Sequence, residues 1–432
     1  MIKVAIISTH KIRCGIASFA DTLDTLLSSD FEIKIFPLDQ FLLRHPAKRV
    51  SKLGDQSLES LLKGIEFCDI VNLQWEPGLL GGSYRSMVKR LRMIVDHLVT
   101  VRKPVIITAH TVVRSDESGS PLSRLSGHAL YVMQTHNLLR RLDQAGLLTM
   151  VAHTPRDRDY FKYVVGLARV VDHPLSYMRK GWVASLPAEA QKYREKLDKQ
   201  MGRGKTIIGT FGFLSDYKGM EVVIRAMREL PDNYLLAIFG EVHPESVKPW
   251  VSVNPYVKKL VDATGPDEVE LRKAASIVNL GSTVNGSNTA SITNEVRAEI
   301  YRKSKSIVDR IHFFGSPDDY EFASAIAACD VAVFPYLEIG QSASGPVSQA
   351  IELQKITVLS RTRTFLELEQ YFPQMIKFFD LGNYIQLADI IRSAVERPHQ
   401  PRQLDYNHET LKDFYGTLFR TQSGQMQRPH HV

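Results

Sequence analysis

The chain has 432 residues, 44% of them hydrophobic, and carries a formal net charge of +7. This length can bury the cores of two domains. Its three cysteines, Cys14, Cys68 and Cys329, exclude a disulfide-rich secreted scaffold and form no metal-binding CxxC or CxxH pattern. No run approaches the about 20 apolar residues of a membrane span. We therefore expect a cytoplasmic globular protein whose positive charge favours anionic partners such as nucleotides, phospholipid headgroups or nucleic acid.

Hydrophobic runs typical of strands alternate with helix-like stretches along the first half of the chain. The opening residues, MIKVAIIS, predict a first strand and lack the pattern of a signal peptide. Helices are predicted in IASFADTLDTLL and in YRSMVKRLRMIVDHLVTV. Further strands are predicted at 31–38, 68–75, 103–110, 128–134, 147–153 and 168–174. Near-continuous apolar strands separated by helices indicate a parallel sheet that is covered on both faces.

A second series begins after a polar helix at about 180–204. Its strands are predicted at 206–214, 234–242, 310–316, 331–336, 356–360 and 375–381. The fold class is therefore α/β, with two facing Rossmann-like, doubly wound parallel sheets and a ligand site in the cleft between them. The expected divisions are an N-terminal domain (1–190), a linker (191–204), a C-terminal domain (205–398) with a mobile insertion near 245–294, and a tail (399–432) whose helix crosses back to the first domain.

Three turns lead from a strand into a helix and contain glycine, lysine or small residues. Such turns suit an anion, because the helix N-terminus presents free N–H groups to it. Gly15 follows the first strand, in STHKIRCGIASF. Lys218 follows the first strand of the second series, in FGFLSDYKG, where a cation can neutralise a diphosphate. Small residues at 342–345 precede a third helix and allow a close approach to a ligand. In the first sheet, Glu76 and His110 come directly after strands, so we expect them at its ligand-facing edge.

These stretches resemble, in order, the motifs of the family 4 retaining glycosyltransferases, which have the GT-B architecture of two facing Rossmann-like domains. The matching stretches lie between Ile2 and about Pro398 and are RCGIASF, NLQWEPGLLGG, TAHTVV, GEVHPE, AEIYRKS and FPYLEIGQSASGPVSQAIELQKITVLS. The resemblance implies retaining transfer of a sugar from a UDP- or GDP-sugar to a hydroxyl of a glycan, lipid-linked or other acceptor in polysaccharide synthesis. It implies no metal ion and no bound cofactor, the sugar nucleotide being a co-substrate.

The resemblance also implies roles for individual residues. Lys218 and the helix N-terminus at 345 would stabilise the leaving diphosphate. Gln341 would contact the donor sugar, Gln349 the ribose, and His110 the donor sugar or the acceptor. The remaining expected site residues are, on the donor side, Gly15, Phe213, Ser342, Ala343, Ser344 and Gly345, and on the acceptor side, Arg13 and Glu76.

Four residues depart from the family pattern. Trp75 replaces a histidine, Phe213 an arginine, and Gln341 and Gln349 two glutamates. An amide keeps the hydrogen-bonding reach of a carboxylate without its charge, which suits the recognition of sugar hydroxyls.

Metal binding is not predicted for the Asp-Arg-Asp triplet at 157–159, although it matches the Asp-x-Asp of metal-dependent sugar transferases. The triplet opens a helix after Pro155, where acidic residues need no metal to explain them. The residues that end the next predicted strand, Asp172, His173 and Pro174, are expected to form a turn that shapes the cleft.

Alternative functions stay open. A non-catalytic GT-B partner protein is suggested by Phe213 and the glutamine pair, and a nucleic-acid glycosyltransferase by the basic charge, although no segment for base stacking is evident. The predicted helix at 83–103 carries Arg85, Lys89 and Arg92 on one side. This side is either a solvated surface or a peripheral contact with an anionic membrane that holds a lipid-linked acceptor.

Overall fold

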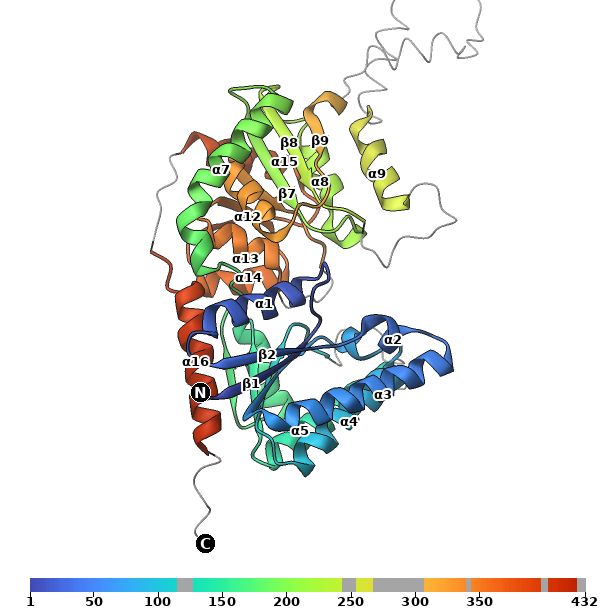
Figure 1. Cartoon of the computed structure of the whole chain (residues 1–432). Helices are drawn as coiled ribbons and strands as arrows, with labels where there is room; N and C mark the ends of the chain where they lie inside the picture. The colour runs from blue at the N-terminus through green and yellow to red at the C-terminus, as the bar shows by residue number, and fades with distance from the viewer. Residues whose placement is uncertain (115–126, 243–253, 267–306, 339–342, 398–402, 426–432) are drawn as a thin grey trace, which may run out of the picture.

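The computed structural model describes residues 1–114, 127–242, 254–266, 307–338, 343–397 and 403–425. These form two domains, each built on a six-stranded parallel sheet (Figure 1). The strand orders are β2-β1-β3-β4-β5-β6 and β12-β11-β10-β7-β8-β9. The prediction of two doubly wound parallel sheets is confirmed.

The N-terminal domain alternates strands and helices as the hydrophobic pattern predicts. In β1, Val4 and Ile6 pack into the core on one face of the sheet, and Ala5 and Ile7 into the core on the other. Successive strand side chains point to opposite faces, so a continuous apolar run needs helices on both. The main elements are β1 (Lys3–Ser8), α1 (Gly15–Leu27), β2 (Glu32–Pro37), α2 (Gln40–Arg44), α3 (Lys48–Gly64), β3 (Ile70–Trp75), η2 (Pro77–Leu80), α4 (Tyr84–Thr100), β4 (Val105–Ala109), α5 (Gly127–Gln144), β5 (Leu148–Ala152), α6 (Pro155–Asp159) and β6 (Val170–Asp172).

The strand predicted at 128–134 is wrong, because these residues lie in α5. The seven-residue window is mostly apolar and contains Tyr131 and Val132, an aromatic and a β-branched residue of the kinds that favour strands. Its continuation, however, buries Leu138, Leu139 and Leu142 beside Tyr131 and Thr135, a spacing of three to four residues that fits a helix. The composition of the seven residues predicted a strand, whereas the helical spacing of buried residues over the longer segment shows a helix.

The C-terminal domain repeats the plan around the second sheet. In β7, Ile207 and Ile208 enter separate cores on the two faces. The main elements are α7 (Lys180–Met201), β7 (Thr206–Phe211), η5 (Asp216–Lys218), α8 (Met220–Ala226), β8 (Tyr234–Phe239), α9 (Pro255–Thr264), β9 (Ile311–Phe313), α12 (Asp319–Ala328), β10 (Val331–Phe334), α13 (Gly345–Glu352), β11 (Ile356–Ser360), α14 (Arg363–Tyr371), β12 (Ile376–Phe379), α15 (Tyr384–Glu396) and α16 (His408–Gln425).

The segment expected as a linker, 191–204, lies largely inside α7 and belongs to the C-terminal domain. Tyr193, Leu197 and Met201 are buried in its core. The chain therefore crosses between the sheets earlier, at 173–179. It crosses back in α16, which lies along the N-terminal domain (Figure 1) and packs Tyr415 and Phe419 against the α1 side of that core.

Part of the expected mobile insertion is an ordered helix. In α9, the side chain of Asn254 caps the first turn and Tyr256 and Leu260 are buried against α8. The rest of 245–294 lies outside the described residues. Among the helices that the structure describes, none is long and apolar enough to cross a membrane.

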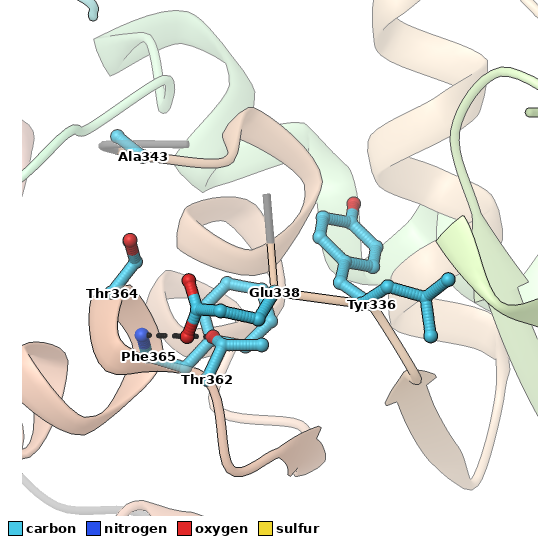
Figure 2. A pocket seen from close by; sticks show the side chains of 7 residues that line it. Tyr336, Glu338, Ala343, Thr362, Thr364 and Phe365 are labelled. Carbon is cyan, nitrogen blue, oxygen red and sulfur yellow. Dashed lines mark hydrogen bonds between the residues drawn. The ribbon is translucent and has the colours of Figure 1, made fainter. Parts of the chain in front are cut away.

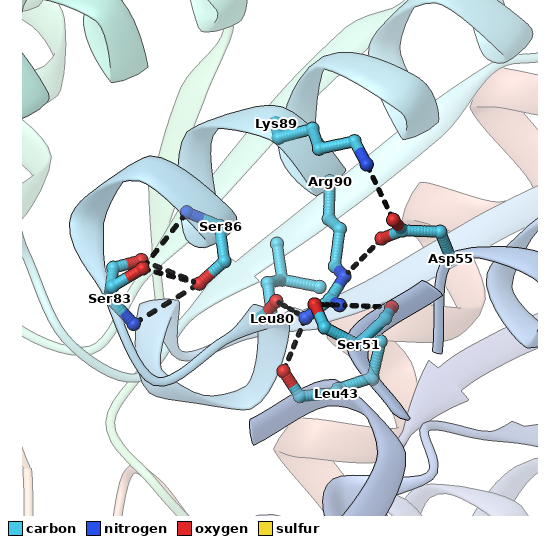
Figure 3. A network of polar contacts seen from close by, with 8 residues as sticks. All are labelled: Leu43, Ser51, Asp55, Leu80, Ser83, Ser86, Lys89 and Arg90. Carbon is cyan, nitrogen blue, oxygen red and sulfur yellow. Dashed lines mark hydrogen bonds and ion pairs between the residues drawn. The ribbon is translucent and has the colours of Figure 1, made fainter. Parts of the chain in front are cut away.

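A buried arginine organises the outer part of the N-terminal domain (Figure 3). The guanidinium of Arg90, in α4, donates to Asp55 at 2.8 Å, to Ser51 at 3.0 Å and to the carbonyl oxygens of Leu43 and Leu80. It thus joins α2, α3, η2 and α4. The apolar side of α4 packs on the sheet, as predicted, through Met87, Leu91, Ile94, Val95 and Leu98.

The basic residues predicted on the other side of α4 are exposed. Lys89 pairs with Asp55 at 2.5 Å, which reduces the positive charge that this side presents to solvent.

Candidate active site

Lys218 lies in the loop after β7 and is buried, with 4% of its surface exposed. Its ammonium is 3.6 Å from the ring centroid of Tyr336 and 4.7 Å from that of Tyr217. Within the described part of the chain no carboxylate pairs with this ammonium. Burial without a counter-charge lowers the pKa of Lys218 well below its ordinary value. Two tyrosine rings therefore enclose the lysine that the sequence analysis assigns to diphosphate binding.

Two glycines shape the loop that holds this lysine. Gly212 and Gly219 have φ angles of 120° and 59°, which L side chains rarely adopt. The Nζ atom of Lys218 lies against Gly212, and a Cβ at Gly219 would overlap the carbonyl oxygen of Pro335. Phe213, which follows Gly212, is half-buried. The loop therefore depends on glycine to bring its backbone onto the end of β10.

The N-terminus of α13 is connected to this lysine through Tyr336. The cap residue Ser344 makes no side-chain hydrogen bond to the helix, because its hydroxyl pairs with that of Tyr336 at 3.0 Å. The first-turn N–H groups, from Gly345 on, have no partner inside the helix and carry positive potential. Lys218, Tyr336 and Ser344 thus connect the two predicted anion-binding segments of the C-terminal domain.

The other residues predicted in this segment have different surroundings. Gln349 is buried, at 7% exposed, and its side-chain amide makes no hydrogen bond to any residue in the described ranges. It lies one turn after Gly345 on the same side of α13. Ala343 is half-buried and packs against the core of the N-terminal domain. Gln341 and Ser342 lie outside the described residues.

A narrow pocket opens next to Ala343 (Figure 2). Its polar lining comes from Glu338, Thr362 and Thr364. Glu338 accepts a hydrogen bond from the backbone N–H of Arg363 at 2.7 Å, and Thr362 caps α14. The pocket therefore adds a carboxylate and hydroxyl groups to the site.

His110 directly follows β4 at the carboxyl end of that strand, and 9% of its surface is exposed. Its Nε2 donates to Oε1 of Gln74 at 2.8 Å, and its ring meets Phe19 edge-on. Burial, with a smaller contribution from His153, lowers the pKa of His110 well below its ordinary value. The imidazole is therefore neutral, a group suited to hydrogen bonding and not to charge stabilisation.

Glu76 caps η2 at the same edge through the backbone N–H of Gly78. Burial raises the pKa of this carboxyl group, against hydrogen bonds that lower it. An aromatic group that the sequence analysis missed lies close by. Burial, with a smaller contribution from the charge of Glu76, raises the pKa of Tyr131. The Tyr131 ring stacks on Tyr84 at 4.6 Å, and Tyr84 is 47% exposed. Tyr131 was missed because its segment read as a strand.

The N-termini of α1 and α13 meet where the two domains touch. Gly15, the first residue of α1, and Gly345, the first residue of α13, both contact the side chain of Tyr177. Arg13 is exposed and pairs with Glu241 of the C-terminal domain at 2.5 Å, so this residue, expected on the acceptor side, bridges the domains. The structure thus brings Gly15 and the 343–345 turn together across the cleft.

The Asp-Arg-Asp triplet lies in α6, and all three of its side chains form ion pairs. Asp157 pairs with Arg114, and Arg158 pairs with Asp159 and Asp172. Searching the described ranges finds no group of three histidine, cysteine or acidic side chains placed to hold a metal ion. His173, in the turn after β6, is buried against Tyr406 and Phe414.

Comparison with solved structures gives the class of this architecture. It is the GT-B fold, and three glycosyltransferase structures match over nearly the whole chain. HepE of Anabaena, in complex with UDP and glucose, has a TM-score of 0.59 at 13% identity and covers 98% of this chain and 100% of its own. Sucrose-phosphate synthase of Thermosynechococcus elongatus has a TM-score of 0.60 at 13% identity, covering 98% and 99%. The UDP-forming α,α-trehalose-phosphate synthase of Burkholderia vietnamiensis has a TM-score of 0.60 at 11% identity, covering 100% of both chains. No protein-family model and no curated protein sequence matches this chain.

Proposed function

We propose that this protein is a retaining glycosyltransferase of the family 4 type. It transfers a sugar from a UDP- or GDP-sugar to a hydroxyl of a glycan or lipid-linked acceptor, in the cleft between the two sheets, in the cytoplasm. The single observation that carries this proposal is the buried ammonium of Lys218, which has no acidic partner in the described part of the protein. The GT-B fold supports the class of reaction, since three glycosyltransferases share it.

An unpaired cation in a buried position destabilises a protein unless an anion completes the site. A diphosphate bound at the N-terminus of α13 would supply two negative charges near Lys218, and would favour the charged form of the lysine. The same contacts would become stronger as the diphosphate leaves, so they would act mainly on the transition state. The cation, the free helix N-terminus and the glycine-shaped loop form one arrangement suited to this task.

The proposed chemistry needs no metal ion and no enzymic base. The bond between the anomeric carbon and the diphosphate oxygen breaks, and the acceptor oxygen bonds to the same face of that carbon. The leaving diphosphate takes the acceptor's proton. Gln341 would bind the donor sugar and Gln349, whose amide is unused within the described structure, the ribose.

The N-terminal domain would supply the acceptor side. Neutral His110, which donates its Nε2–H to Gln74, would accept a hydrogen bond at Nδ1 from a hydroxyl of the donor sugar or the acceptor. Glu76 and the exposed ring of Tyr84 offer a carboxylate and an aromatic face, which together suit a sugar acceptor.

Calorimetric titration with UDP and with GDP tests the proposal. The wild type should bind at least one of them, and Lys218→Met should weaken that binding by about tenfold or more, the value of a charge-assisted contact. Lys355→Met is a matched control, since Lys355 is a part-buried lysine of the same domain that donates to the carbonyl oxygen of Ala327 at 3.0 Å. Its nucleotide affinity should match the wild type.

Failure of the wild type to bind either diphosphate would contradict the proposal and favour a non-catalytic partner protein. If binding is found, incubation with a panel of sugar nucleotides, followed by mass spectrometry, identifies the donor.

A further inference from the structure

One buried tyrosine contacts the first residue of a helix in each domain. Tyr177 lies in the segment 173–179 that crosses between the sheets and is 5% exposed. Its hydroxyl donates to the carbonyl oxygen of Gly15 at 3.2 Å. Its ring lies against Gly345, where an added Cβ would be 3.1 Å from the ring atom Cζ. The side chain therefore fills the space between the N-termini of α1 and α13.

Both ends of helix α13 contact Tyr177. Glu352, the last residue of α13, accepts a hydrogen bond from the backbone N–H of Tyr177 at 2.9 Å and another from the hydroxyl of Ser176. Gly345 and Glu352 are seven residues apart, nearly two turns, so they lie on the same side of the helix. The backbone and the ring of Tyr177 are thus held against α13, and its hydroxyl makes the hydrogen bond to α1.

We propose that Tyr177 is a positioning residue that sets the spacing between the N-termini of α1 and α13, so that both face one diphosphate-bearing ligand. This inference rests on the proposed function. The positive potential of a helix N-terminus falls off within its first turn, so a change in spacing of about 1 Å weakens it at the ligand. Misplacement of this size costs up to about a hundredfold in rate.

The same contact explains why residue 345 is glycine. The sequence suggested that a missing side chain there lets the ligand approach. In the structure, the tyrosine ring occupies that side of the backbone, so any Cβ would push the ring and, with it, the hydroxyl that holds α1.

Tyr177→Phe tests the proposal, because it removes the hydroxyl and keeps the ring. The matched control is Tyr415→Phe, which removes an equally buried hydroxyl that pairs with Thr108 at 2.8 Å inside the N-terminal domain. Both rings also meet Phe19 edge-on. The two variants should lose similar thermal stability, so a difference in activity between them reports on position and not on folding.

Three quantities are measured: the rate of nucleoside diphosphate release from its sugar nucleotide, the Kd of that diphosphate, and amide hydrogen exchange at 18–21. These are the first amides of α1 that have backbone acceptors, beginning with Ser18, which donates to the carbonyl oxygen of Cys14 at 3.0 Å. Tyr177→Phe should lower kcat by about tenfold or more. It should leave Kd within about threefold, since Lys218 and α13 remain in place, and it should speed exchange at 18–21. Tyr415→Phe should leave kcat, Kd and exchange at 18–21 unchanged.

Equal effects of the two variants, an unchanged kcat in Tyr177→Phe, or a parallel tenfold loss of nucleotide affinity would each overturn the positioning role. If the wild type binds no nucleoside diphosphate, the proposed function fails, and hydrogen exchange then decides alone. Faster exchange at 18–21 only in Tyr177→Phe supports the spacing role, and unchanged exchange overturns it.

Discussion

The ammonium of Lys218 lies 3.6 Å from the centre of the Tyr336 ring, although the two residues are far apart in the sequence. A cation over an aromatic face gains some electrostatic stabilisation, but much less than the burial of its charge costs. The ring therefore holds the lysine in place without neutralising it. Removing the charge of Lys218 should therefore stabilise the protein while it weakens the proposed binding of a diphosphate.

Lys218→Met should increase the free energy of unfolding by about 1 kcal/mol or more, because it replaces a buried, unpaired cation with an apolar chain of similar size. Between the lowered pKa of Lys218 and the ordinary value of 10.5, the unfolded chain binds more protons than the folded one. The free energy of unfolding of the wild type therefore rises with pH in that window, and its difference from that of Lys218→Met should become smaller. Urea unfolding at two pH values checks this. A variant that is less stable than the wild type at every pH would contradict it.

Glu352→Gln should change how stability depends on pH. Burial raises the pKa of Glu352 to about 7, against hydrogen bonds from Ser176, Tyr177 and Met178 that lower it. Because the folded pKa lies above the ordinary value of 4.5, the folded protein keeps this proton longer than the unfolded chain. Wild-type stability, relative to Glu352→Gln, should fall by about 1–3 kcal/mol as pH rises from 4.5 to 7 and then stay level. Denaturant unfolding of both proteins at pH 5 and pH 8 measures this difference, and equal differences at the two values would exclude the raised pKa.

Arg90→Met should destabilise the N-terminal domain by about 3–5 kcal/mol, because it leaves the carboxylate of Asp55 and several carbonyl oxygens without their buried donor. Lys89→Met is the matched control. It removes the neighbouring, exposed cation from the same carboxylate and should cost at most about 1 kcal/mol. Chemical denaturation compares the two, and similar losses would show that Arg90 has no special role.

Gly219→Ala should cost about 3 kcal/mol or more, because it adds a clash with the carbonyl oxygen of Pro335 to the strain of a positive φ angle. Gly315→Ala has a similar φ angle, 68°, with no atom within 4 Å of the added Cβ, so its cost should be about 1–2 kcal/mol of strain alone. Thermal unfolding distinguishes the two. The Gly219 variant should also weaken nucleotide binding, since the same loop carries Lys218, and an unaffected Kd would contradict the proposed position of that lysine.

Several elements could be predicted because their signal is local. The runs at 3–8, 206–211 and 331–334 are largely apolar stretches that only a sheet covered on both faces can bury. The polar segment at 180–204 is predicted as a helix, but the sequence analysis divides it between the N-terminal domain (to 190) and a linker (191–204). Its Tyr193, Leu197 and Met201 become core residues only against the second sheet.

The sequence alone determined the two parallel sheets and the glycine-containing turns that precede α1 and α13, because apolar periodicity and turn composition act over a few neighbouring residues. Only the tertiary structure decided that Lys218 is buried, that Tyr84 and Tyr131 stack beside Glu76, and that Tyr177 joins Gly15 to Gly345. Each of these depends on groups brought together from distant parts of the chain, and 162 residues separate Tyr177 from Gly15. Burial and charge compensation are properties of such assembled surroundings, which no local pattern encodes.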